Sequence, residues 1–184
     1  MKDAIMSMLV LVTISTTVPK EAVADHAKVL SVDQKCCVYS EVERPVDSIC
    51  EMQVLECLVE ETFVNGALNR MDTKAMFRGF HRDFAILIPQ QGGLMRLGLS
   101  DWVKVVEAYK NDPAKVKSGV RKLDFKIDVL DITGRTAVVK VQFFRVGELV
   151  ITDYLSYIKY PNGWQAVSKV SHEHINNPLQ LDFN

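Results

Sequence analysis

Two short stretches of this 184-residue chain carry side chains that can move protons. His81 and Asp83 alternate within the stretch Phe80–Phe84, and Asp153 and Tyr157 occupy positions of equal parity further on. Residues of equal parity point to the same side of a strand, and a carboxylate among apolar side chains has its pKa raised by desolvation, which suits a general base. The candidate catalytic residues are therefore His81, Asp83, Asp153 and Tyr157, with Asp153 as base and Tyr157 as donor.

Each of these residues also has a structural interpretation. Asp153 can pair with Lys169 on the neighbouring strand, as opposite charges do across strands. His81 follows a predicted helix end, where histidine often caps carbonyl groups or packs on an aromatic ring. The chain contains no phosphate-loop, dinucleotide-binding or nucleophile-elbow motif. We therefore favour binding over catalysis, and we expect no metal site and no cofactor.

The elements that position these residues follow from hydrophobic periodicity. A long amphipathic helix is predicted from Ser48 to about Asn65 or Asn69, and a short one follows Asp72. A strand over 84–88 and its return over 94–97 flank a turn, and Ser100 should cap a third helix that ends at Asn111-Asp112-Pro113. Four longer strands then follow, each alternating apolar and polar residues from about Val120 to His172.

A sheet of this size must cover its apolar face, and only the helices can do so. The sequence therefore predicts an α+β fold in which three helices pack on a curved, mainly antiparallel sheet of about six strands. In such a fold the sheet curves around the long helix like a cone, and the helix and the concave face of the sheet enclose a cavity.

Four pieces of the chain resemble the bacterial proteins called putative lumazine-binding, a branch of the nuclear transport factor 2-like superfamily with a cystatin-like fold. They are Phe80-His81-x-Asp83-Phe84, Gly92-Gly93 with Ser100-Asp101-Trp102, Thr152-Asp153-Tyr154-Leu155-Ser156 and Gly163-Trp164-Gln165-Ala166-Val167-Ser168-Lys169. The resemblance covers about residues 48–174. Members of this superfamily include isomerases, dehydratases and plain binding modules. The predicted cavity and the absence of a catalytic motif favour a module that binds a small hydrophobic or aromatic molecule. The alternatives are a cofactor-free isomerase or dehydratase of the ketosteroid isomerase and SnoaL-like kind, and a dimerising domain without ligand.

In this fold the cavity lies between the first helix, the third helix and the sheet. We expect aromatic and apolar side chains to line it, with His81 and Asp83 at its mouth and Asp153 and Tyr157 inside. The ligand-binding candidates are Phe63, Phe84, Trp102, Phe125, Val141 and Trp164.

The ends of the chain differ from the middle. Residues 1–24 have the order of a secretory signal peptide, an arm spans 25–47, the domain spans 48–175, and 176–184 form a C-terminal tail. The four cysteines, Cys36, Cys37, Cys50 and Cys57, are candidates for disulfides whose pairing stays open. We expect a secreted or periplasmic protein without a membrane span once the signal is removed, or a cytoplasmic one if residues 1–24 are no signal.

The net charge of the chain and the outer face of the predicted sheet indicate which partners to expect. The formal net charge is -1, and no basic run marks a nucleic-acid surface, so we expect no nucleic-acid partner. On the predicted strand that contains Asp153, the side chains of Tyr154, Ile158 and Tyr160 point to the opposite, outer side. This apolar outer face predicts a homodimer that packs sheet to sheet.

Overall fold

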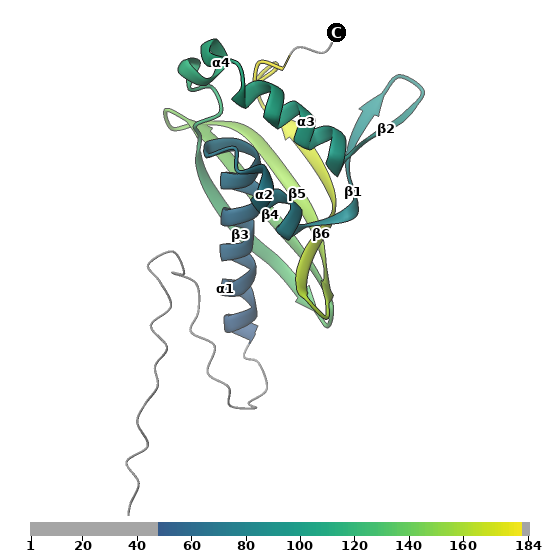
Figure 1. The fold of residues 1–184 in the computed structure, drawn as a ribbon. Coiled ribbons are helices and arrows are strands. Elements are labelled where there is room, and N and C mark those ends of the chain that lie inside the picture. Colours follow the sequence, from purple (N-terminus) through teal and green to yellow (C-terminus); the bar gives the residue numbers. More distant parts are fainter. Residues whose placement is uncertain (1–47, 182–184) are drawn as a thin grey trace, which may run out of the picture. The chain divides into compact units, whose positions relative to one another are not determined.

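The computed structural model describes residues 48–181 (Figure 1). The predicted signal peptide and the arm lie outside these residues, as do Cys36 and Cys37.

The predicted long helix is present, and its second half is wound more widely than an α-helix. α1 (Ser48–Val59) continues directly into the π-helical segment η1 (Glu60–Asn69), where the amide of Arg70 donates to the carbonyl of Asn65 at 3.2 Å. The short helix α2 (Thr73–Gly79) begins after Asp72, whose side chain accepts from the amide of Ala75 as predicted. Within residues 48–181, no helix combines the length and apolar character needed to cross a membrane.

The third helix differs from the prediction at both ends. α3 (Leu99–Lys110) starts one residue before Ser100, and no side chain caps its first turn. Asn111-Asp112-Pro113 ends it but also begins a fourth, unpredicted helix, α4 (Pro113–Ser118). Asp112 accepts from the amides of Ala114 and Lys115, and proline is well placed in a first turn because its missing N–H is not needed there.

Six strands form one sheet in the order β2-β1-β6-β5-β4-β3. The strands are β1 (Phe80–Gln90), β2 (Gly93–Gly98), β3 (Asp124–Thr133), β4 (Thr136–Arg145), β5 (Glu148–Tyr160) and β6 (Gly163–Glu173). β1 runs parallel to β6, and all other neighbours are antiparallel. The mainly antiparallel α+β fold is confirmed, although β1 starts at Phe80, so the stretch Phe80–Phe84 is itself strand.

The helices cover one face of the sheet. Figure 1 shows α1 in front of β3 and β4, while α3 lies at the other end of the sheet near β1. The predicted inner parity of β4 is buried throughout, from Ala137 to Phe143. Phe63 of η1 packs edge-on against Phe143 at 5.6 Å and against Phe80 at 6.2 Å, which joins the helix to both halves of the sheet.

One polar contact fixes the start of α1 against the far end of the sheet. The carboxylate of Glu51 accepts hydrogen bonds from Lys159 of β5 and from Trp164 Nε1 of β6, the latter at 2.8 Å. Burial raises the pKa of Glu51, but the two donors and the positive charge of Lys159 outweigh burial and leave this pKa below its usual value. The folded state therefore favours the ionised form.

This contact predicts a pH-dependent effect of Glu51→Gln. The substitution should lower the free energy of unfolding by about 1–2 kcal/mol at neutral pH, because charge-assisted hydrogen bonds are lost. Because its folded pKa is lowered, Glu51 stabilises the fold above its unfolded pKa of about 4.3, and this contribution disappears as pH falls through the folded pKa. Urea unfolding should therefore show the two proteins converging in acid. Exposed Glu60→Gln is the control and should match wild type throughout; a constant difference for Glu51→Gln would contradict the prediction.

Candidate ligand-binding site

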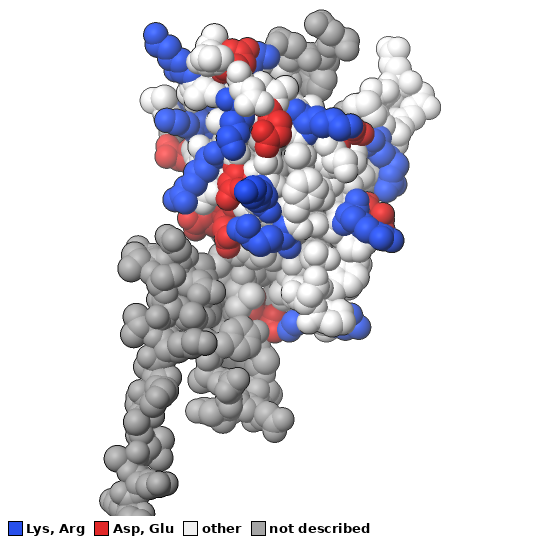
Figure 2. All heavy atoms as spheres, in the orientation of Figure 1, with Lys and Arg blue, Asp and Glu red and all other residues white. Residues whose placement is uncertain are grey.

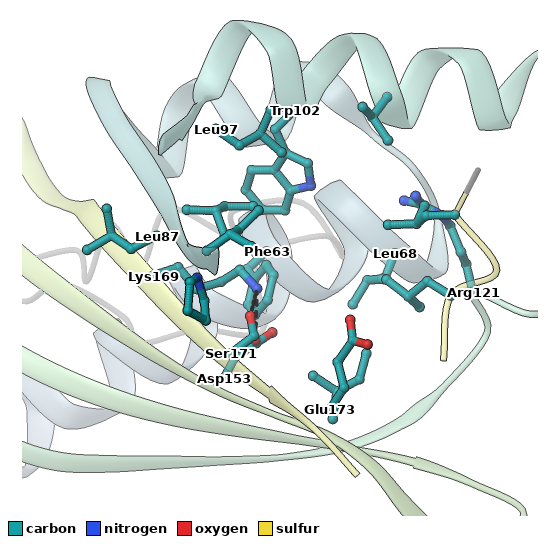
Figure 3. A pocket seen from close by; sticks show the side chains of 17 residues that line it. Phe63, Leu68, Leu87, Leu97, Trp102, Arg121, Asp153, Lys169, Ser171 and Glu173 are labelled. Carbon is teal, nitrogen blue, oxygen red and sulfur yellow. Dashed lines mark hydrogen bonds and ion pairs between the residues drawn. The ribbon is translucent and has the colours of Figure 1, made fainter. Parts of the chain in front are cut away.

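A cavity of about 420 Å³ opens between η1, α3, the β1–β2 hairpin and the ends of β5 and β6 (Figure 3). Most of its lining side chains are apolar, and they come from every layer of the fold. The lining residues are Phe63, Leu68, Ile86, Leu87, Ile88, Pro89, Leu97, Trp102, Val105, Arg121, Ile151, Asp153, Lys169, Ser171, Glu173, Leu179 and Leu181.

Two aromatic side chains give the cavity a rigid wall. Phe63 and Trp102 lie 6.0 Å apart between ring centroids, and the far side of Trp102 stacks on Phe84 at 5.6 Å. Phe80 packs edge-on against Trp102 at 5.2 Å and against Phe84 at 4.6 Å. The Phe80–Phe84 stretch therefore supports the cavity wall through its two phenylalanines.

A buried ion pair lies at the sheet side of the cavity. Lys169 Nζ donates to Asp153 Oδ1 at 2.7 Å and to Ser171 Oγ at 2.6 Å, and the two charged side chains are only 9% and 3% exposed. Asp153 pairs with Ser171 across β5 and β6, so Lys169 reaches it diagonally on the same face. The carboxylate is thus held by an ammonium group and is not a free base.

The opposite end of the cavity holds Arg121. This side chain is 3% exposed, its Nη1 donates to the carbonyl of Ala67 at 2.8 Å, and its guanidinium lies 4.5 Å from the ring centroid of Tyr109. Burial lowers the pKa of Arg121, while the nearby Tyr109 hydroxyl raises it slightly. Figure 3 shows Arg121 beside Leu68, on the other side of the cavity from Asp153 and Lys169.

Three of the predicted residues, Phe63, Trp102 and Asp153, line the cavity together. Four predicted ligand contacts do not. Phe84 lies behind Trp102, Val141 is fully buried between Ile127 and Asp153 of the adjacent strands, and Trp164 bonds Glu51 at the far end of the sheet. Phe125 is 36% exposed because β3 is an edge strand.

His81 and Asp83 do not line the cavity, contrary to their predicted place at its mouth. The imidazole stacks on the ring of Tyr160 at 5.1 Å, and its Nδ1 accepts from the amide of Asp83 at 3.2 Å. The Asp83 side chain is 74% exposed. The pairing of β1 with β6 shifts register between Phe80 and Ala85, and in this irregular stretch Phe80 and Phe84 are buried while Asp83 faces solvent.

Tyr157 is also absent from the lining. It is 1% exposed, its hydroxyl has no hydrogen-bond partner among residues 48–181, and burial strongly raises its pKa. Its predicted role as a proton donor beside Asp153 therefore has no support in the cavity's geometry.

The cysteine and metal predictions concern other parts of the chain. Cys57 of α1 is disulfide-bonded. Cys50 lies seven residues earlier on the same helix and is half-buried. Within the described part of the chain, no cluster of histidine, cysteine and acidic side chains has the geometry of a metal site.

Sequence reasoning missed several lining residues. The sequence indicates Lys169 only as a partner of Asp153, and Arg121 lies at the start of the predicted long strands, where nothing in the pattern indicates a cavity residue. The residues assigned to a tail also contribute, because Leu179 and Leu181 line the cavity and the carbonyl of Pro178 accepts from Arg145 at 2.6 Å. The apolar pair Leu179 and Leu181, spaced two apart in a polar end, was the available signal.

The ion pair leads to a prediction for a double-mutant cycle. Asp153→Leu or Lys169→Met alone should lower the free energy of unfolding by about 3–5 kcal/mol, since each leaves a buried charge without its partner. The double variant Asp153→Leu with Lys169→Met should be much less destabilised than the sum of the single changes. Chemical unfolding of all variants measures the coupling. Additive effects would show that the two charges do not stabilise each other.

Comparison with known proteins places this geometry in a family. Residues 52–172 match the model of the family described as "Putative lumazine-binding". The fold is shared with a nuclear transport factor 2-like protein of unknown function from Silicibacter pomeroyi, with 20% identity, a TM-score of 0.54, and coverage of 70% of this chain and 99% of that one. One from Methylobacillus flagellatus has 24% identity, a TM-score of 0.50, and coverage of 73% and 98%.

No curated protein matches the chain. At these identities the two solved structures support the fold alone, and the family match supports membership. The chain belongs to the putative lumazine-binding family, and its fold is that of nuclear transport factor 2-like proteins.

Proposed function

We propose that this protein is a binding or accessory module that holds one small hydrophobic or aromatic molecule in its cavity. The observation that carries the proposal is the cavity of about 420 Å³ with a mainly apolar lining. Ligand pockets of proteins typically measure about 300–1,000 Å³ and combine apolar walls with a few fixed polar groups. Here the aromatic rings of Phe63 and Trp102 offer flat contact surfaces, and the buried charges offer polar ones.

The cavity chemistry favours binding over the alternative of a cofactor-free isomerase or dehydratase. A general base needs a carboxylate or imidazole free to accept a proton within reach of the substrate. Asp153 is held by Lys169, and His81 lies outside the cavity, stacked on Tyr160. Glu173 also lines the cavity, but its side chain is exposed to solvent.

The two tryptophans provide a built-in test of binding. Trp102 lines the cavity and Trp164 does not, so a bound apolar probe should change the fluorescence of Trp102 only. With the neutral probe N-phenyl-1-naphthylamine, Trp164→Phe should keep the saturable change in tryptophan emission, and Trp102→Phe should lose it. Titration of the full chain measures both.

A cavity-filling variant is the matched control. Leu97→Trp places a large ring into the cavity from the half-buried β2 and should weaken probe binding at least tenfold. Leu94→Trp lies on the same strand, is 58% exposed and does not line the cavity, so it should bind like wild type. Equal binding by all variants would place the probe elsewhere and refute the proposal.

We further propose that two chains associate through the outer face of the sheet. Val138, Tyr154 and Val170 are 39–45% exposed, and Tyr154 lies directly opposite Val170 across β5 and β6. An apolar patch on a strand face of this kind favours association with a second copy. Figure 2 shows the opposite, helical side of the molecule, where positive and negative side chains are interspersed.

If two chains associate in this way, a charge introduced into the outer face of the sheet should lower the mass of the particle in solution. Tyr154→Lys should convert a dimer to a monomer in sedimentation velocity, because an ammonium group would be placed in the apolar interface. Leu94→Lys, on the β1–β2 hairpin away from this face, should leave the dimer intact. A wild-type protein that sediments as a monomer at micromolar concentration would contradict the proposal.

Secretion or periplasmic export, directed by residues 1–24, is likewise proposed. The disulfide at Cys57 supports it, since structural disulfides are typical of oxidising compartments.

A further inference from the structure

Arg121 is a buried cation at the cavity without a carboxylate partner in the described part of the chain. Its one side-chain hydrogen bond to these residues joins Nη1 to the carbonyl of Ala67, and its Nε is fully buried without a partner. A guanidinium group has five N–H donors, and buried charges are normally paired because desolvation is costly. Most of the hydrogen-bonding capacity of Arg121 is therefore unused.

The surroundings hold this guanidinium in place. Its planar face lies on Tyr109, whose hydroxyl donates to the carbonyl of Lys115 at 2.7 Å. The carbonyl of Ala67 fixes one terminal nitrogen near the end of η1. Among residues 48–181 these contacts leave Nη2 without a hydrogen-bond partner, and Nε beside it is buried without one. A carboxylate suits such a guanidinium, since it accepts charge-assisted hydrogen bonds from arginine N–H groups.

The other charges at the cavity do not compensate Arg121. Asp153 is neutralised by Lys169 at 2.7 Å. Glu173 is exposed, and within residues 48–181 no ion pair joins it to Arg121. Figure 3 shows Glu173 and Asp153 reaching into the cavity from the sheet below, while Arg121 approaches from the side.

We propose that the ligand of this cavity is a carboxylic acid with an apolar or aromatic body, whose carboxylate binds Arg121. This inference rests on the proposed binding function and narrows its ligand class. The apolar body fits against Phe63 and Trp102, and the single negative charge balances one buried cation. A phosphate monoester fits less well, because its second charge would remain uncompensated away from water.

Matched probes test this inference on the full chain. We expect 2-naphthoate to bind wild type at least tenfold tighter than the neutral 2-naphthamide, and tighter than 2-naphthyl phosphate, by isothermal titration calorimetry. Arg121→Met should weaken naphthoate binding by about 10- to 100-fold, the usual effect of losing a charge-assisted pair, and change naphthamide binding less than threefold. Arg82→Met, 88% exposed and outside the cavity, is the control and should match wild type.

Two further variants separate a ligand role from a structural one. Arg121→Lys keeps the charge but loses the planar fork, so its preference for the acid should fall between those of wild type and Arg121→Met. Glu173→Gln removes a negative charge from the cavity and should leave naphthoate binding unchanged or tighter. If Arg121→Met does not fold, the wild-type comparison of acid and amide still decides.

The outcomes distinguish this inference from the binding function beneath it. If neither naphthyl compound nor the neutral probe binds, the proposed function fails. If 2-naphthamide binds as tightly as 2-naphthoate, or Arg121→Met still binds naphthoate more tightly than naphthamide, the cavity binds a ligand but Arg121 does not bind its carboxylate. Tighter binding of the phosphate, or weaker acid binding by Glu173→Gln, would overturn the assignment to a carboxylate beside Arg121.

Discussion

The structure depends on one packing constraint: a single long helix must cover the concave side of a six-stranded sheet. Phe63 of η1 meets this constraint at the centre, where its ring touches Phe80, Trp102 and Phe143 from three different elements. Glu51 fixes the other end of the same helical run to β5 and β6. The cavity lies beside Phe63, and α3, the β1–β2 hairpin, β5, β6 and the C-terminal residues complete its lining.

Burial has different consequences for the charges around this space. Asp153 and Lys169 lose water together and satisfy each other, so their pair is a closed unit that also bonds Ser171. Arg121 is buried without a carboxylate among residues 48–181, where its side chain contacts a carbonyl and an aromatic face. Coulomb attraction is strong where the dielectric constant is low, so an uncompensated cation there selects for an anion. The asymmetry between the two sites directs a ligand's charged end toward Arg121.

The sequence predicted the fold well because helix and strand periods are local properties. The alternation Ala137–Phe143 and the capping Asp72 were sufficient to place β4 and α2. Asp153 was expected either to act as a base in the cavity or to pair with Lys169, and the structure shows the pair. The cavity was harder to predict, because its lining depends on which parts of the sheet face the helices leave uncovered. Parity correctly put Val141 and Tyr157 on the inner face, but it could not reveal that packing buries them completely.

The stretch Phe80–Phe84 shows why adjacent residues can mislead. His81 and Asp83 suggest a catalytic pair when they are read as the end of a helix that opens on a pocket. As part of β1 they lie in a stretch where the register against β6 shifts: the rings of Phe80 and Phe84 are buried, whereas Asp83 is exposed and His81 stacks on Tyr160. The same strand then reaches the cavity at Ile86 and Ile88, whose apolar side chains can shape a ligand but cannot transfer a proton.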